Sequence, residues 1–321
     1  MTQADGPGEG VSTRAVLLLA LALAAAGCGS ERAYAPRPPL AVVGTWSGLQ
    51  WRTIAPGMGG VAEPVSANVC ARGAPACMDA VVAEMTQRFE RLAARCDHLA
   101  PFALMYRQVS SEVSASVHAR RYRDSGYLAH MDAVFATLYF RALDDWRLGH
   151  GDEVPRAWRV AFSAADSRRV TALGDLLLGM NAHISRDLPY ALEAVSLRLP
   201  NGRDAVPDVT AVNDDIARAQ GPMLAQVAAR FDPTVREAGR LGEFGDPQEI
   251  STNIARWRRE AVRNARRLLA ADTPVERRRV ETQIDTNATI RALLIRWAMT
   301  YVEPQRESAA RRRYCEAARA S

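Results

Sequence analysis

The sequence has no lysine: all 41 of its basic residues are arginine, against 36 acidic residues, and the formal net charge is +5. Exclusive use of arginine together with frequent alanine is typical of a GC-rich genome, so we attribute the basic balance to codon bias before nucleic-acid binding. No recognition motif for DNA or RNA is present either. The composition therefore predicts that nucleic acid is not a partner.

Common catalytic motifs are missing as well. No GxSxG, P-loop or GxGxxG sequence occurs, which removes the signatures of α/β-hydrolases, NTPases and dinucleotide-binding domains. Histidine is scarce, with five residues at positions 98, 118, 130, 150 and 183, so few imidazoles are available for a metal site. The sequence by itself identifies no reaction.

Long hydrophobic runs are limited to one, Ala15 to Ala26, whose twelve residues are too few to span a bilayer as a helix. This length suits the core of a signal peptide, and small residues lead from it directly into Cys28. The ending resembles the lipobox of bacterial lipoproteins, although Ala25 stands where the pattern usually has Leu. Residues 1–28 are therefore expected to be a lipoprotein signal peptide and lipobox. These residues predict an exported cell-envelope protein that is anchored to the membrane by a lipid on Cys28, with a plain cleaved signal or a spurious upstream extension as the alternative.

After this signal, residues 29–75 are expected to form a tether and an irregular arm, since Pro36, Pro38 and Pro39 favour an extended spacer. Residues 76–321 are expected to form one helical domain. Apolar residues recur there at three- and four-residue spacing, for example over 79–95, 102–119 and 127–147, with little strand signal and no polar linker. The predicted fold class is all-α, a single bundle-like domain of many helices.

A helical hairpin is predicted over residues 246–302. Asp246-Pro247-Gln248-Glu249 and Thr273-Pro274-Val275-Glu276 each combine a capping residue, a proline at the first helical position and a glutamate at the third. The two helices should pack antiparallel through apolar stripes. The expected buried stripes are Ile250, Ile254, Trp257, Ala261, Ala265 and Leu268 on the first helix and Val280, Ile284, Leu294, Trp297 and Tyr301 on the second.

The same C-terminal region carries an excess of positive charge. From residue 251 onward there are 16 arginines and 8 acidic residues, a local charge of +8. Such a run usually forms the solvated faces of amphipathic helices. In a protein tethered to a membrane it also suits contact with anionic lipid headgroups, so both interpretations stay open.

Four cysteines remain when Cys28 is set aside: Cys70, Cys77, Cys96 and Cys315. An even number in an exported protein favours disulfides over free thiols. Cys70 and Cys77 bracket a short loop, whereas Cys96 ends a predicted helix and Cys315 lies in the last one. We therefore expect one local bridge and one long-range bridge. A zinc site is the alternative, but CxxC spacing is absent and the fold would have to gather all four ligands.

One of the most apolar segments of the helical region, Gly174 to Leu192, contains three polar residues, Asn181, His183 and Asp187. Burying an unpaired polar group costs on the order of 1–3 kcal/mol, so each of them needs a specific partner. His183 and Asp187 are four residues apart and therefore share one face of a helix. Pro189 removes a backbone donor and should kink the helix just beyond them. We expect a kinked central helix whose His183–Asp187 pair is the best candidate site.

Three interpretations of these polar residues are open. They form a satisfied network that holds the helices in register around the kink. Alternatively, they line a pocket for a small polar or lipid-derived ligand, because apolar clefts with a few polar groups bind such molecules. In the third interpretation they belong to a hydrolase, with His183 as base or metal ligand and Asp187 orienting it, although no nucleophile motif accompanies them.

The run LLLGMNAHISRDLPYAL, with VPRAWRVAF before it and DVTAVND after it, resembles an uncharacterised bacterial family of helical domains of unknown function. The signature of that family is a GMNAHI-x-x-DLP core, a tryptophan segment upstream and a Val-Asn pair downstream, and the resemblance covers about residues 80–235. It points to Trp158, Asn181, His183, Asp187 and Asn213 as candidate binding residues. It implies no reaction.

The His-x-x-x-Asp pattern before an apolar residue and a proline is more distantly similar to the metal-binding helices of zinc-dependent phospholipases C and single-strand-specific zinc nucleases. This similarity implies one divalent cation on His183 and Asp187, which would polarise a phosphoryl oxygen and activate water. Those enzymes bind three zinc ions through many histidines and the amine of an N-terminal tryptophan, which a lipidated Cys28 does not offer. At most one metal is therefore expected. Its further candidate ligands are His130, Asp132 and the pair Asp214 and Asp215.

Overall fold

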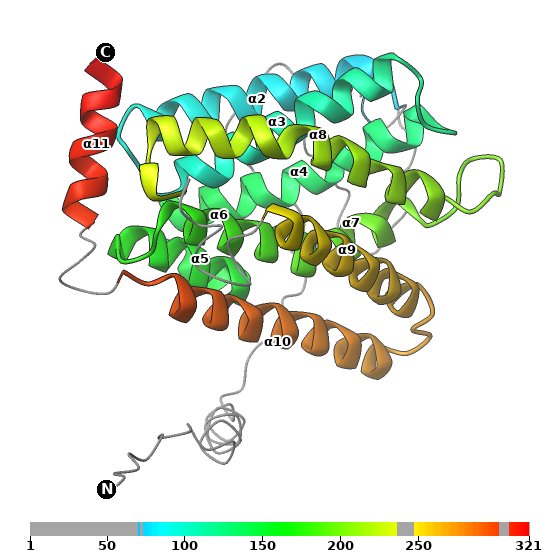
Figure 1. Ribbon diagram of the computed structural model, residues 1–321. Coiled ribbons are helices and arrows are strands. Elements are labelled where there is room, and N and C mark those ends of the chain that lie inside the picture. Colours follow the sequence, from blue (N-terminus) through cyan, green and yellow to red (C-terminus); the bar gives the residue numbers. More distant parts are fainter. Residues whose placement is uncertain (1–69, 71–72, 236–246, 302–307, 321) are drawn as a thin grey trace, which may run out of the picture. The chain divides into compact units, whose positions relative to one another are not determined.

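The computed structural model describes residues 70, 73–235, 247–301 and 308–320. The predicted signal, Cys28 and nearly all of the predicted arm lie outside these ranges. Regular structure within them is entirely helical, which confirms the all-α fold class (Figure 1), and pairing between extended residues is limited to two isolated bridges. The α-helices are α2 (Pro75–Ala93), α3 (Ala100–His118), α4 (Ser125–Arg147), α5 (Arg156–Ser167), α6 (Ala172–Asn181), α7 (Leu188–Val195), α8 (Val206–Arg230), α9 (Pro247–Leu269), α10 (Pro274–Met299) and α11 (Ser308–Ala320).

The central element is the helical segment from α6 to α7. In Figure 1 it runs through the middle of the helices, with α2, α3 and α8 above it and α10 below it. Its first half contacts α3, α5 and α10, and its second half contacts α4 and α9. Every residue from Ala172 to Leu192 is buried, so the segment contributes core on all sides. The polar residues that it carries must therefore find partners on the surrounding helices.

The predicted kink takes the form of a π-helical turn, Ala182–Asp187, which joins α6 to α7. At its end the Leu188 backbone N–H donates to the His183 carbonyl oxygen, five residues back instead of four. Pro189 then lies in the first turn of α7, where a missing backbone donor costs little. The wide turn thus admits the proline without breaking the helix, and π-helical turns are frequent at functional sites.

The predicted C-terminal hairpin is present as α9 and α10. Thr273 and Glu276 form a complete capping box at the start of α10, and the expected stripe on α9 is buried. Asp246, the other predicted cap, lies outside the described residues. On α10 the predicted stripe is wrong at Leu294 and Trp297, which are 58% and 81% exposed. The buried face instead follows Val280, Ile284, Ala288, Ala292 and Ile295, because small side chains let α10 approach the central segment closely.

The sequence pattern also predicts a start of the central helix at about Ser167 and a new helix at Gly221-Pro222, and both predictions are wrong. The central helix begins at Ala172, where Thr171 accepts a hydrogen bond from the Gly174 N–H. Pro222 lies inside the continuous helix α8. The contacts of α8 along α3 and α9 offset the backbone bond that this proline removes.

Both expected disulfides are formed, Cys70–Cys77 locally and Cys96–Cys315 across 219 residues. They fit an oxidising compartment. The long-range bridge fastens α11 to the loop before α3. No helix within the described residues is long and apolar enough to cross a membrane.

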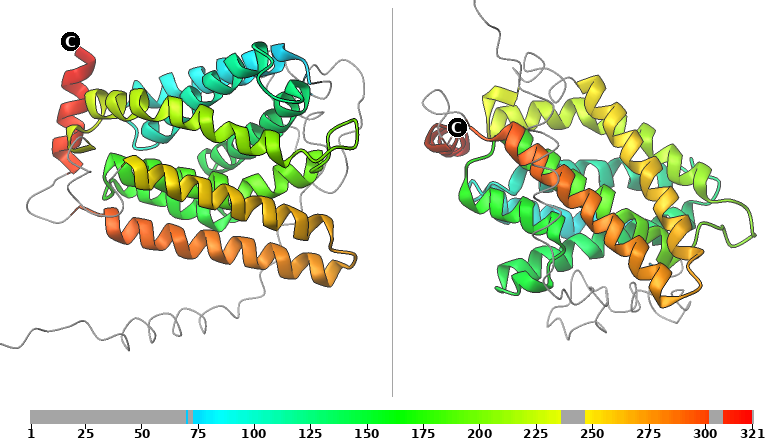
Figure 2. Two further views of the ribbon diagram at one scale, coloured as in Figure 1. Left: turned by 45° about the vertical axis from the view of Figure 1, so that its right-hand side comes forward. Right: turned by 90° about the horizontal axis from the view of Figure 1, so that it is seen from below.

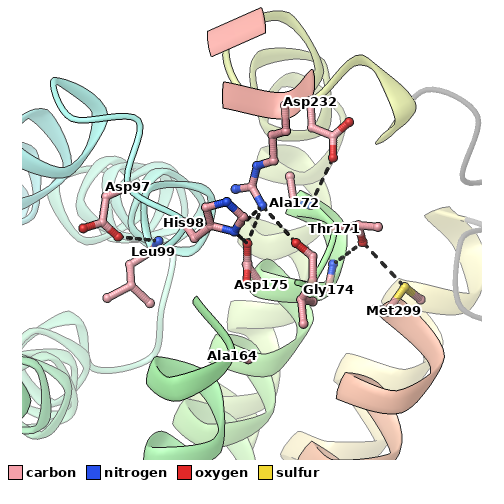
Figure 3. Close-up of polar contacts among 12 residues, drawn as sticks. Asp97, His98, Leu99, Ala164, Thr171, Ala172, Gly174, Asp175, Asp232 and Met299 are labelled. Carbon is pink, nitrogen blue, oxygen red and sulfur yellow. Dashed lines mark hydrogen bonds and ion pairs between the residues drawn. The ribbon is translucent and has the colours of Figure 1, made fainter. Parts of the chain in front are cut away.

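A buried charged cluster holds α11 in the same region. Arg311 donates to the Asp175 carboxylate of α6 at 2.5 Å, and His98 Nδ1 lies 3.0 Å from the same oxygen (Figure 3). Nearby, the backbone N–H of Ala172, the first residue of α6, donates to the carboxylate of Asp232, which follows α8. These contacts tie the N-terminal end of the central segment to α11 and to the end of α8.

Gly179→Ala is expected to lower the free energy of unfolding by about 1–3 kcal/mol, as overpacked cores do. A Cβ at Gly179 would lie 2.4 Å from the Phe102 ring, and Phe102 is itself packed edge-on against Tyr139 and Trp158. Urea unfolding measures the change. The matched control is Gly151→Ala in the short turn before α5, where a Cβ would meet its nearest neighbour, the Trp146 ring, at an ordinary contact distance of 3.5 Å. Equal effects of the two substitutions would contradict this account of the Phe102 packing.

Candidate functional site

A pocket lies beside the π-helical turn, between α3, α4, α8 and α9. Its cavity volume is about 50 Å³, and part of it is open to solvent. A single water needs on the order of 10–15 Å³, so the cavity holds several waters or one end of a larger ligand. Most of the lining is apolar, with Met105, Val109 and Val113 from α3, Met131 and Phe135 from α4, Val212 and Ile216 from α8, and Ile254 from α9. Four polar side chains also reach it: Tyr106, Asp132, His183 and Arg258.

Behind the pocket, the fully buried carboxylate of Asp187 accepts hydrogen bonds from three side chains. The indole N–H of Trp158 donates to Oδ2 at 2.7 Å, and Arg186 donates to Oδ1 at 3.0 Å. His183 Nδ1 lies 3.2 Å from Oδ2. Since a carboxylate only accepts, Nδ1 of His183 carries the proton and its Nε2 is left as an acceptor.

The imidazole of His183 is held from its faces as well as its edge. It stacks on the Phe135 ring at a centroid distance of 3.5 Å, and the Tyr106 ring meets it edge-on at 4.5 Å. Burial lowers the pKa of His183, against the hydrogen bond and the charge of Asp187, so the ring is neutral near pH 7. Its Nε2 is buried and has no hydrogen-bond partner among the described residues. The atom is thus an oriented acceptor next to the pocket.

Asp132 supplies a carboxyl group with unusual protonation. It is buried on α4, and its Oδ2 has no partner among the described residues. Burial raises the pKa of Asp132 to about 7, even though the charge of Arg258 acts in the opposite direction. The group therefore changes charge near neutral pH.

Arg258 is the cation of the pocket, and only 5% of it is exposed. One of its terminal nitrogens donates to the Val209 carbonyl oxygen at 2.6 Å, whereas Nε has no partner and no ion pair is formed with any described residue. Burial lowers the pKa of Arg258 to about 10, so the guanidinium is still charged at neutral pH. The Tyr106 hydroxyl also has no partner among the described residues, and burial raises its pKa, which keeps it a hydrogen-bond donor.

The residues singled out by the sequence divide into two groups. Trp158 and Asp187 bond to each other behind the pocket, and Asn181 donates to the Ala288 carbonyl oxygen of α10 at 2.8 Å. These three fasten the central segment to α5 and α10. Asn213 follows the lining residue Val212 on α8 but does not line the pocket itself. Of the five candidates, His183 alone lines the pocket.

Sequence reasoning missed Tyr106 and Arg258. Arg258 follows Ile254 by four residues and so falls within the apolar stripe of α9, which was the available signal. Arg258 was overlooked because α9 contains many other arginines, which lie on its exposed face. Tyr106 gave no signal, since an aromatic residue on the apolar face of a helix is ordinary core.

Among the described residues, the suggested metal ligands do not gather into one set of three or more. Asp187 already accepts from three donors, and Asp215 is bonded to Ser116, Tyr122 and Arg218 away from His183. Within the described ranges, no group of three or more histidine, cysteine, aspartate or glutamate residues is placed to hold a metal ion. His183 and Asp132 both reach the pocket, but His130 and Asp214 do not line it.

Asp132→Asn is expected to stabilise the protein most strongly above neutral pH. Since burial raises the pKa of Asp132 from 3.8 to about 7, the folded state binds this proton more tightly than the unfolded state does. The stabilisation by this proton is fully present below about pH 4. It decreases as the pH rises from about 4 to about 7, and at higher pH the free energy of unfolding no longer changes through this group. Asparagine does not titrate, so the gain should grow over this window and reach a few kcal/mol.

Urea unfolding of the two proteins at several pH values between about 5 and 8 measures this gain. Asp214→Asn, at an exposed position of α8, is the matched control. A gain from Asp132→Asn that is the same at every pH would show that Asp132 does not titrate in this way.

The comparisons with known proteins give one match. A family model described as "Family of unknown function (DUF5995)" matches residues 78–297. The matched range includes every pocket-lining residue and extends beyond the resemblance noted at 80–235, over most of the α9–α10 hairpin. No curated protein and no solved structure matches the chain. Because the family model covers well over half of the sequence, this chain belongs to the family of unknown function DUF5995.

Proposed function

We propose that this protein binds a small amphipathic, lipid-derived ligand in the pocket beside His183. The observation that carries the proposal is that four buried polar side chains line one apolar pocket, each with an atom that has no hydrogen-bond partner among the described residues. Leaving one such group unsatisfied costs on the order of 1–3 kcal/mol, so native proteins rarely keep several together without a ligand or bound water. Apolar pockets with a few convergent polar groups are the usual form of ligand sites.

The types of polar groups define the chemistry of the ligand. Arg258 and the Tyr106 hydroxyl offer a positive charge and donors, which suit a carboxylate or another anionic oxygen. The Nε2 atom of His183 accepts, which suits a hydroxyl group on the same ligand. Met105, Met131 and Met180 supply flexible apolar lining that can adapt to an acyl chain. The best fit is therefore a fatty acid or hydroxy fatty acid whose polar end reaches Arg258 and His183.

The proposed location agrees with this ligand class. We place the protein in the cell envelope, exported by the signal at residues 1–28 and anchored through a lipid on Cys28. The two disulfides support an oxidising compartment. A membrane-anchored protein is surrounded by acyl chains and their breakdown products, so a lipid-derived ligand is at hand.

The second candidate function is that of a metal-dependent hydrolase acting on phosphoesters. The feature that favours it is the Asp187–His183 pair, because metal-binding histidines commonly donate their second ring N–H to a carboxylate. A cation at His183 Nε2 would then lie at the pocket, whose lining also contains one acidic residue, Asp132. The further ligands would have to come from solvent or substrate.

Arg258→Met is expected to weaken binding of a fluorescent polyene fatty acid about ten-fold or more, because it removes the cation that pairs with the carboxylate. The substitution keeps the apolar stem, so the pocket retains its size. Fluorescence titration of the purified protein gives the dissociation constants. Arg259→Met, on the exposed face of the same helix, is the matched control and should bind as the wild type does. Unchanged binding in Arg258→Met, or no binding by the wild type, would refute this role of the pocket.

The metal-dependent candidate predicts stoichiometric zinc after dialysis, measured by elemental analysis, and loss of that zinc in His183→Gln. Asp187→Asn should weaken the zinc about 10–100-fold, as changes to the groups that orient a ligand do. Asn213→Ala, which lies outside the pocket lining, should keep the metal. A wild-type protein that retains no zinc and cleaves no phosphodiester probe removes this candidate and leaves the fatty-acid proposal untouched.

A further inference from the structure

The outer face of α10 carries an exposed apolar stripe. Ile290, Leu294 and Trp297 are 51%, 58% and 81% exposed, and their spacing of four and three residues places them on one face of the helix. The opposite face of α10 is buried against α5, α6 and the π-helical turn. Single exposed apolar residues are normal on protein surfaces, whereas a row that ends in an almost fully exposed tryptophan suggests a contact surface.

The same hairpin is strongly basic. Exposed acidic residues on the described parts of α9, α10 and their connection are Asp272 and Glu276, which lie together where the two helices join. None of the exposed arginines forms an ion pair with a described residue. These arginines are Arg256, Arg259, Arg263, Arg266 and Arg267 on α9 and Arg278, Arg279 and Arg296 on α10.

The two features belong to neighbouring surfaces. α9 and α10 contact each other, and the right-hand view of Figure 2 shows α10 along the face turned toward the viewer with α9 beside it. Arg256, Arg259, Arg263 and Arg266 recur at three- and four-residue spacing, so they form one ridge along α9. The hairpin thus carries a positive ridge on α9 and an apolar stripe on α10, the helix that it contacts.

We propose that this hairpin surface docks on an anionic lipid bilayer. Tryptophan and leucine side chains enter the interface between headgroups and acyl chains, while arginines reach the lipid phosphates. Charge complementarity and the apolar stripe together select this partner. Nucleic acid would use the arginines but not the exposed apolar row, and a second copy of the chain would bring two positive surfaces together.

The docking surface is independent of the pocket, because its residues point away from the pocket lining. Within α9, Ile254 and Arg258 face the pocket, whereas Arg256 and Arg259 are exposed. Binding to lipid by this surface also needs no lipid on Cys28. The two attachments are therefore separable by mutation.

The test uses the full chain carrying Cys28→Ser, so that no lipid can be attached there, and sedimentation with vesicles. Binding is expected to vesicles of phosphatidylglycerol mixed with phosphatidylcholine, to fall steeply with added salt, and to be weak with phosphatidylcholine alone. The double variant Leu294→Ser/Trp297→Ser should lose about ten-fold or more of the binding. The matched control is Leu148→Ser, at a 69% exposed leucine just after α4, which should bind as before.

The tryptophan also gives a direct signal. Binding to anionic vesicles should shift the Trp297 emission to shorter wavelength, seen as the difference between the Cys28→Ser chain and the same chain with Trp297→Phe. Equal binding to both vesicle types, no binding, or full binding by the double variant would overturn the proposal. Binding to duplex DNA that is as tight as binding to anionic vesicles and does not depend on Trp297 would assign the surface to nucleic acid instead.

Discussion

The carboxylate of Asp187 is the group on which the centre of this structure depends. It is fully buried, and a buried charge is tolerated only when donors surround it. Trp158 brings a donor from α5, and Arg186 and His183 bring donors from the π-helical turn itself. Arg186 also reaches Asp285 of α10 at 3.4 Å, so the charge balance extends across two helices. Removing one of these donors would leave the buried carboxylate less fully hydrogen-bonded, which costs folding free energy.

This saturated network gives His183 its second role. With Nδ1 committed to Asp187, the neutral ring keeps Nε2 as an acceptor that has no partner among the described residues, and Phe135 fixes the plane of the ring. The structural and the binding interpretations of the segment are therefore parts of one arrangement. Asp187 and its donors hold the ring on one side, whereas the residues that line the pocket include polar atoms with no partner among the described residues. The donors around Asp187 are all hydrogen-bonded, whereas the polar residues of the pocket have atoms with no partner among the described residues. This difference is the physical reason to place the ligand in the pocket.

Local chemistry explains which features the sequence could predict. Pro189 signalled the interruption of the central helix, the Thr273 and Glu276 pair signalled the start of α10, and cysteine spacing signalled both disulfides. The stripe of α10 failed because its periodicity allows two faces, and the fold buries the one with Ala288 and Ala292 to bring helices close. The sequence could not predict the details of the pocket, because the pocket forms where α3, α4, α8 and α9 meet. The role of Arg258 depends on those neighbouring helices.

The helix α9 connects the two proposals physically. Its inner face contributes Ile254 and Arg258 to the pocket, and its outer face carries the arginine ridge. A bilayer that attracts the ridge would hold the same helix that forms one wall of the pocket. Lipid phosphates would then lie close to the exposed Arg259, while a ligand carboxylate would pair with the preceding residue, the buried Arg258. Because the two faces of α9 carry different residues, substitutions on one face leave the other unchanged, so the pocket and the docking surface can be tested separately by mutation.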